Sequence, residues 1–231
     1  QLNVEKYSTP TASVILGGKA IVCSGEQGVS YYVEGMPGSD YSWDITGGSI
    51  TETLDSSVTV DWAVPPGVYT LSVLEESVDG CWGDTIELAV QVEGPEVELG
   101  EDSYVCQGEL FTISLEDNYS GITWDDGSSG TTYSTYEQGW ISVTVSDDYA
   151  CTASDSLYLS VVDLPEVDLG SDTSLCGNEG LVLDAGTDGT TYLWSTGDNS
   201  QVITVYQGER REISVVVEDD YGCVSSDTVI I

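Results

Sequence analysis

The cysteines of this sequence constrain its fold more than any other feature. Six of them form successive pairs along a three-fold repeat, Cys23 and Cys81, Cys106 and Cys151, and Cys176 and Cys223. The segment PEVELGEDSYVC, from Pro95, recurs as PEVDLGSDTSLC, from Pro165, and SVTVSDDYAC recurs as SVVVEDDYGC. The N-terminal part carries a looser version, with YSWDITGG and GVYTLSVLEESVDGC. A unit that recurs at a nearly fixed period predicts successive copies of one domain.

We place the three domains at residues 1–93, 94–163 and 164–231. The boundaries fall at the segments VEGP and VDLP, because a proline lacks the N–H that a strand ladder needs and so separates one ladder from the next. Residues 1–9, QLNVEKYST, have no counterpart in the other two copies. They are therefore interpreted as an N-terminal extension of the first domain.

Each copy has the pattern of short β-strands. Apolar residues alternate with polar ones in several runs, among them 58–60, 141–145 and 213–217, and Ser, Thr, Gly and Asp clusters separate the runs. No window sustains the apolar spacing of a helix, and β-branched residues and tyrosine dominate. The sequence therefore predicts an all-β chain of three antiparallel sandwiches, each with about seven strands.

Repetition also predicts how the cysteines pair. Six cysteines allow 15 connectivities, and three equal copies favour the sequential one, Cys23 with Cys81, Cys106 with Cys151, and Cys176 with Cys223. Each bond would stabilise its domain by a few kcal/mol and would imply an oxidising compartment. The alternative, a zinc site made of cysteines, lacks both the close C-x-x-C spacing and any histidine.

The net charge excludes two classes of partner. Four Lys and Arg side chains accompany 41 Asp and Glu side chains, a formal charge of −37. Nucleic acids and anionic lipids are bound by clustered cations, so neither is expected. The sequence has no apolar run long enough for a membrane helix, so no direct membrane insertion is expected. Cations, basic proteins and neutral glycans remain as partners, and the acidity also serves solubility on its own.

The motifs LGxDxxxC, YLWSTGDNSQVITV and SVxVxDxYGCxxSDTV resemble the immunoglobulin-like and PKD-like repeats of surface and secreted proteins of Bacteroidota, including gliding-motility adhesins exported by type IX secretion. The first domain resembles the PKD-like variety through YSWDITGGSI and GVYTLSV. The resemblance implies an extracellular or cell-surface location and a structural or adhesive role. Members of this family commonly continue into a C-terminal sorting domain, whereas this sequence ends at SDTVII.

Catalysis is not expected. The chain has no histidine, two lysines and two adjacent arginines, Arg210 and Arg211, so nucleophilic triads are excluded. Carboxylate pairs of the glycosidase kind are available, but small sandwiches in series offer no deep cleft. We therefore expect no enzyme and no cofactor, with calcium as the one candidate ion.

Acidic residues near the cysteines are the calcium candidates, since calcium prefers several oxygen ligands. They are Glu101, Asp102, Asp147, Asp148, Asp219 and Asp220. No EF-hand loop is present. The alternative is that Asp-Asp before Tyr forms a turn, in which aspartate side chains accept backbone hydrogen bonds.

Two further sets of residues recur in the copies. The tripeptides DTI, DSL and DTV resemble an O-glycosylation motif of Bacteroidota and would place sugars on Thr85, Ser156 and Thr228; the alternative is strand alternation with the hydroxyl facing water. Tryptophans at equivalent positions, Trp43, Trp124 and Trp194, are predicted to pack between sheets. Trp62, Trp82 and Trp140 do not recur and are interpreted as half-buried strand residues, or as a surface for a sugar or a neighbouring domain.

The sequence thus predicts a non-catalytic extracellular structural or adhesive protein. In one form of this hypothesis it is the subunit of a surface filament, a homopolymer in which the extension adds as an edge strand to another subunit through Leu2, Val4 and Tyr7. Other surface proteins or glycans are the remaining partners. The alternatives are an accessory, carbohydrate- or protein-binding region of a secreted enzyme and a calcium-rigidified spacer.

Salt is expected to stabilise this protein. At a charge of −37 the carboxylates repel one another, and counterions screen that repulsion. The unfolding temperature should therefore rise between low and moderate NaCl concentrations at constant pH. An unfolding temperature that does not change with salt would contradict this expectation.

Overall fold

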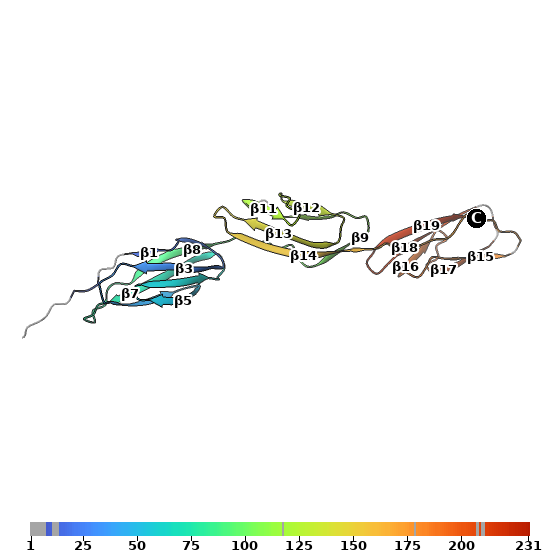
Figure 1. The fold of residues 1–231 in the computed structure, drawn as a ribbon. Coiled ribbons are helices and arrows are strands. Elements are labelled where there is room, and N and C mark those ends of the chain that lie inside the picture. The colour runs from blue at the N-terminus through green and yellow to red at the C-terminus, as the bar shows by residue number, and fades with distance from the viewer. Residues whose placement is uncertain (1–7, 11–13, 117, 178, 207, 209–210) are drawn as a thin grey trace, which may run out of the picture. The chain divides into compact units, whose positions relative to one another are not determined.

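The computed structural model describes residues 8–10, 14–116, 118–177, 179–206, 208 and 211–231. Every regular element in these residues is a β-strand (Figure 1), which confirms the all-β prediction. No helix in the described part of the chain is long and apolar enough to cross a membrane. The strands form three groups that follow one another along the sequence, and no sheet contains strands of two groups.

The first strand group contains two four-stranded sheets, in the orders β1-β3-β6-β5 and β2-β8-β7-β4. Its strands are β1 (Ile15–Gly17), β2 (Ile21–Cys23), β3 (Glu26–Val33), β4 (Asp40–Ile45), β5 (Ser49–Leu54), β6 (Ser57–Trp62), β7 (Gly67–Glu76) and β8 (Ile86–Glu93). With β1 to β8 lettered A, A′, B, C, D, E, F and G, these are the ABED and CFG sheets of the immunoglobulin sandwich, with A′ added beside G. The immunoglobulin-like prediction is confirmed for this group.

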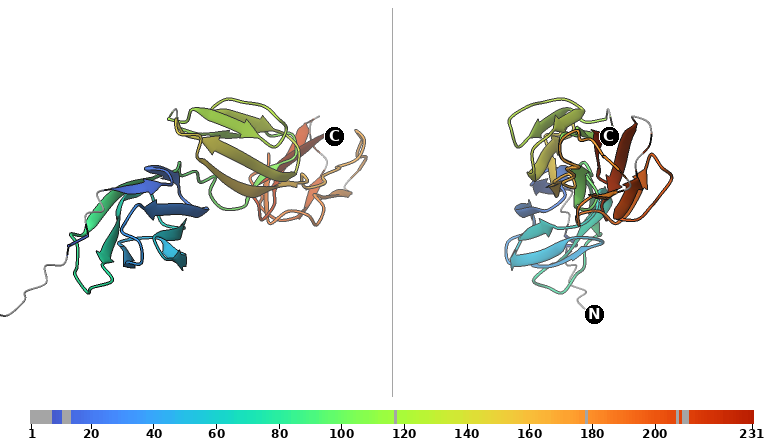
Figure 2. Two further views of the ribbon diagram at one scale, coloured as in Figure 1. Left: turned by 60° about the vertical axis from the view of Figure 1, so that its left-hand side comes forward. Right: turned by 90° about the vertical axis from the view of Figure 1, so that its right-hand side faces the viewer.

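The core of the first group lies between its two sheets. In β6, Val58, Val60 and Trp62 alternate with polar residues and are buried, and Leu71 and Val90 face them from the second sheet. Figure 2 gives two further views of the layers. Trp62 is fully buried, which corrects its interpretation as a half-buried strand residue, whereas Trp43 is half-buried at the margin of this core.

The second and third strand groups are shorter versions of the same plan. The second has the sheets β10-β12 and β11-β13-β14-β9, and the third has β15-β17 and β16-β18-β19. The strands of the second group are β9 (Ser103–Cys106), β10 (Phe111–Ser114), β11 (Gly121–Trp124), β12 (Thr132–Thr135), β13 (Gly139–Ser146) and β14 (Thr152–Val162). Those of the third are β15 (Gly180–Asp184), β16 (Thr191–Trp194), β17 (Val202–Tyr206), β18 (Glu212–Glu218) and β19 (Val224–Ile230).

Equivalent tryptophans anchor these two groups, as predicted. Trp124 and Trp194 are each 2 % exposed. The indole N–H of Trp124 donates to Gly130 O at 3.0 Å, and that of Trp194 donates to Ser200 O at 2.8 Å. Each ring thus buries its apolar surface and satisfies its single donor within the following turn.

The strand that ends in a cysteine pairs in parallel, which departs from the wholly antiparallel prediction. β2 runs parallel to β8 with Cys23 opposite Glu93, and β9 runs parallel to β14 with Cys106 opposite Val162. In the third group the N–H of Thr173 donates to Ile230 O at the end of β19. β2 and β9 therefore each end beside the last residue of the final strand of their own group.

The domain boundaries at residues 93 and 163 stay a prediction. Strand pairing follows the three groups, but packing divides the chain into two compact units. One unit comprises Gln1–Glu98, Glu116–Thr131 and Ser142–Asp155, and the other comprises Leu99–Leu115, Thr132–Ile141 and Ser156–Ile231. Each disulfide described below lies within one of these units.

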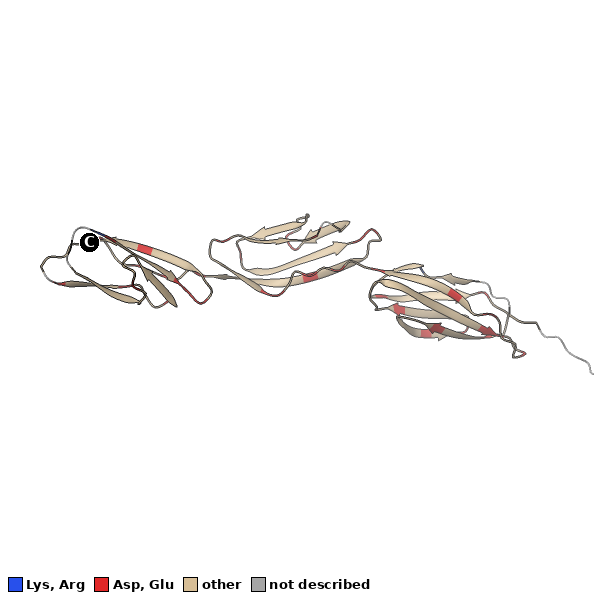
Figure 3. Cartoon of the chain, turned by 180° about the vertical axis from the view of Figure 1, so that it is seen from behind, with Lys and Arg blue, Asp and Glu red and all other residues tan. Residues whose placement is uncertain are grey.

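Acidic residues are distributed over strands and loops of every strand group (Figure 3). The predicted polymer contact, Leu2, Val4 and Tyr7, lies outside the described residues.

Replacing Trp194 tests the assignment of the third core. Trp194→Ala removes a buried indole and its hydrogen bond and should lower the free energy of unfolding by roughly 3 to 5 kcal/mol. Leu193→Ala is the matched control, because Leu193 lies on the same strand and is 62 % exposed; its effect should stay within about 0.5 kcal/mol. Urea denaturation followed by fluorescence and circular dichroism measures both, and equal effects would contradict the core assignment.

Candidate functional site: two overlapping disulfides

The cysteine pairing differs from the predicted one. Cys23 is bonded to Cys151, with Cα atoms 5.3 Å apart, and Cys106 is bonded to Cys223, with Cα atoms 5.5 Å apart. Cys81 and Cys176 are free. The sequential pairing, one bond inside each domain, is therefore wrong, and each bond instead joins a cysteine of one strand group to a cysteine of the next.

The reason lies in the parallel pairing of β2 and β9. Cys23 lies beside the last residue of β8, whereas Cys81 precedes the first residue of that strand. A strand of eight residues is roughly 26 Å long, and a disulfide needs Cα atoms within about 7 Å. Cys106 and Cys151 are separated in the same way by the 11 residues of β14. The two cysteines of one group thus lie at opposite ends of its last strand.

Two kinds of cysteine can now be distinguished. The leading cysteines, Cys23, Cys106 and Cys176, come early in each group, and the turn cysteines, Cys81, Cys151 and Cys223, follow the turn before its last strand. Both disulfides join a leading cysteine to the turn cysteine of the following group. The two loops that they close overlap between residues 106 and 151.

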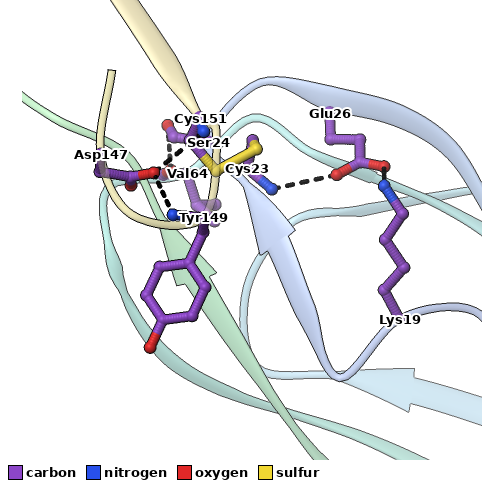
Figure 4. Close-up of a disulfide and its surroundings, with 8 residues drawn as sticks. All are labelled: Lys19, Cys23, Ser24, Glu26, Val64, Asp147, Tyr149 and Cys151. Carbon is purple, nitrogen blue, oxygen red and sulfur yellow. Dashed lines mark hydrogen bonds and ion pairs between the residues drawn. A yellow bond between two sulfur atoms is a disulfide. The ribbon is translucent and has the colours of Figure 1, made fainter. Parts of the chain in front are cut away.

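The turn that presents Cys151 is built by an aspartate. Asp147 Oδ1 accepts hydrogen bonds from the N–H groups of Tyr149 and Cys151, both at 2.9 Å (Figure 4). Asp219 Oδ1 accepts the equivalent bonds from Tyr221 at 2.9 Å and Cys223 at 2.8 Å. These carboxylates thus accept the backbone hydrogen bonds that the turn interpretation predicts.

The turn cysteine of the first group is presented by the same turn with a serine in place of the aspartate. Ser77 Oγ accepts from the N–H of Cys81 at 3.1 Å, and the N–H of Ser77 donates to Cys81 O at 2.9 Å. The latter bond recurs between Asp147 and Cys151 at 3.1 Å. The backbone of this turn therefore does not depend on the aspartate.

A glutamate three residues after each bonded leading cysteine accepts a hydrogen bond from the backbone N–H of that cysteine. This contact was not predicted from the sequence. The N–H of Cys23 donates to Glu26 Oε2 at 3.0 Å, and that of Cys106 donates to Glu109 Oε2 at 3.4 Å. Lys19 Nζ lies 2.6 Å from Glu26 Oε1 (Figure 4), and its hydrogen bond is the main cause that lowers the pKa of Glu26. The recurring spacing CSGE, CQGE and CGNE was the signal that could have revealed this role.

The predicted calcium ligands are not brought together. Among the residues that the structure describes, no group of three or more Asp, Glu, Cys or His side chains could hold a metal ion. Asp102 Oδ1 accepts from the N–H of Tyr158 at 2.8 Å, Asp148 accepts from the hydroxyl of Ser120, and Glu101 and Asp220 are exposed. Calcium binding stays a prediction.

The predicted glycosylation residues Thr85, Ser156 and Thr228 are all exposed. Both interpretations require this, since strand alternation also directs the hydroxyl outward, so glycosylation stays a prediction.

Comparisons with known proteins leave the family open. No protein-family profile matches the chain, and no curated protein matches it. Among solved structures, the SGBP-B protein of the Bacteroides ovatus mixed-linkage glucan utilization locus, in complex with a heptasaccharide, is 13 % identical over 97 % of this chain and 70 % of that chain, with a TM-score of 0.30. The I67–I69 fragment of titin is 15 % identical over 97 % of this chain and 98 % of the fragment, with a TM-score of 0.34. The FN1–FN3 domains of chicken CNTN1 are 14 % identical over 96 % of this chain and 99 % of that chain, with a TM-score of 0.31. Likeness at this level adds no argument, so the fold assignment rests on strand order.

The residue before each turn cysteine offers a paired test of the turn. It has a left-handed backbone in all three groups, with φ of 75° at Gly80, 64° at Ala150 and 78° at Gly222. A side chain costs about 1 to 2 kcal/mol in this region, so Ala150→Gly should raise the free energy of unfolding by about 1 kcal/mol. Gly222→Ala should lower it by a similar amount, because a Cβ there meets no atom closer than 3.9 Å. Urea unfolding measures both, and changes of the same sign would contradict this account.

Proposed function

We propose that this chain is a non-catalytic extracellular module that carries mechanical load and presents an adhesive surface. The observation that carries the proposal is the pair of overlapping disulfides. Disulfides persist in oxidising compartments such as the extracellular space, which supports the location. The absence of histidine and the scarcity of lysine and arginine in the sequence support a role without turnover.

The disulfides shorten the covalent path between the two ends. From residue 1 the path runs to Cys23, crosses to Cys151, returns along the chain to Cys106, crosses to Cys223 and continues to residue 231. A force on the ends therefore loads only residues 1–23, 106–151 and 223–231. Most of the first and third strand groups lies off this path and is shielded from the force once the chain is taut.

An exposed tryptophan that packs on a half-buried tyrosine favours an adhesive surface. Trp140 is 65 % exposed and lies edge-to-face with Tyr158, with ring centroids 5.4 Å apart. Exposed aromatic rings are anchors for binding sugars and proteins, because they bury a large area at a small entropic cost. Trp82 is another exposed indole, at 52 %. These rings support glycans or other surface proteins as partners.

Stretching single molecules tests the load-bearing proposal. At about 3.6 Å per residue, the oxidised chain held at its ends should extend to roughly 280 Å, because about 78 residues lie on the path. After reduction it should reach roughly 830 Å. The double variant Cys23→Ser, Cys106→Ser is the control and should reach the longer extension without reductant. An oxidised chain that extends as far as the reduced one would refute the proposal.

A further inference from the structure

The two free cysteines, Cys81 and Cys176, are of the two kinds that bond to each other elsewhere in this chain. A leading cysteine bonds to the turn cysteine of the next group, which accounts for Cys23 with Cys151 and Cys106 with Cys223. Cys176 is a leading cysteine and Cys81 is a turn cysteine. The unpaired residues are thus one of each kind, and the two kinds are complementary.

Cys81 is presented as its bonded equivalents are. The Ser77 turn gives its N–H the same acceptor position that Asp147 gives to Cys151, and Gly80 has the left-handed backbone of Ala150. Cys81 is half-buried, and the next residue, Trp82, is 52 % exposed. A partner at this cysteine would therefore also cover an exposed indole.

Cys176 has the sequence spacing of a leading cysteine and follows a segment that lies beside the last strand of its group. Glu179 follows it at the spacing by which Glu26 follows Cys23. The N–H of Thr173, three residues before Cys176, donates to Ile230 O, so this segment lies beside the last strand of its group. The thiol is exposed.

We propose that Cys176 of one copy of this chain and Cys81 of a second copy form an intermolecular disulfide. The contact joins two different surfaces, so it is heterologous, and repetition gives an open chain of copies unless it closes into a ring. The link would repeat between copies the connection already made twice within one copy. This inference rests on the proposed extracellular role, because it needs an oxidising compartment.

The reaction requires an oxidant. The two thiols lose two protons and two electrons, and a small-molecule or protein disulfide accepts them and is reduced to two thiols. The thiolate of one cysteine attacks that disulfide to form a mixed disulfide, and the second thiolate then displaces the leaving thiolate. The exposed Cys176 is the better placed to make the first attack, because access limits the rate.

The proposed link lacks an aromatic contact that accompanies one of the existing disulfides. Beside the Cys106–Cys223 bond, Tyr104 and Tyr221 lie edge-to-face, with ring centroids 5.3 Å apart. The corresponding residues at the proposed link, two before each cysteine, are Ser174 and Asp79, so this aromatic contact is missing. Each copy also carries a charge of −37. Repulsion between copies opposes their approach and is screened by salt, so the link should form faster at moderate ionic strength.

Two single variants and their mixture test the proposal. The full chain, oxidised in a glutathione redox buffer, should give a ladder of dimers, trimers and longer species on non-reducing gels, which collapses to one band on reduction. Cys81→Ser alone and Cys176→Ser alone should each remain monomeric. Their equimolar mixture should give one dimer and nothing longer, because only one complementary pair is present.

Mass spectrometry of the disulfide-linked peptides distinguishes the possible failures. A dimer whose linked peptides contain Cys81 and Cys176 supports the inference. Equal dimerisation of Cys81→Ser alone, a monomeric mixture, or a bond from Cys81 to Cys176 within one copy would overturn it. If the linked peptides of Cys23–Cys151 and Cys106–Cys223 are present but the intermolecular bond is not, only this inference fails and the proposed function is unaffected. If those peptides are missing as well, the proposed function fails too.

Discussion

The parallel pairing of one short strand with the last strand of its group determines how this chain is held together. β2 beside β8 and β9 beside β14 carry a cysteine to the far end of the last strand, away from the other cysteine of the same group. Had these strands paired antiparallel from the other end, a bond within each sandwich would have been within reach. The direction of three or four residues thus selects between separate disulfide loops, one in each group, and two loops that overlap along the sequence.

Much of the fold could be predicted from the sequence. Alternation in runs such as 58–60 and 213–217 gave the strands and the buried faces, and the equivalent tryptophans Trp124 and Trp194 gave two of the cores. These signals are local, because a strand's period and a buried ring depend on residues close in sequence. Trp62 does not recur in the other copies, so its sequence position does not indicate a core residue. In the first group it is nevertheless fully buried, whereas the recurring Trp43 lies at the margin of the core.

The cysteine pairing could not be predicted in the same way. In a repeat, a bond within copies and a bond between neighbouring copies use the same residue types in the same order along the chain. Only the direction of β2 relative to β8 separates them, and Ile21–Cys23 is too short to show a direction in its pattern. The turn around Cys151 shows the opposite case: its DDY sequence suggested a local hydrogen-bonding role for Asp147, and that role is present.

Overlap of the two disulfide loops has a consequence for the survival of the chain outside a cell. Proteases cut exposed loops first, and sandwiches joined by short connections offer many such loops. Any single cut between residues 23 and 223 falls inside at least one of the two loops. Both fragments then stay covalently attached, so a nicked molecule keeps its ends connected until a second cut or a reductant separates them.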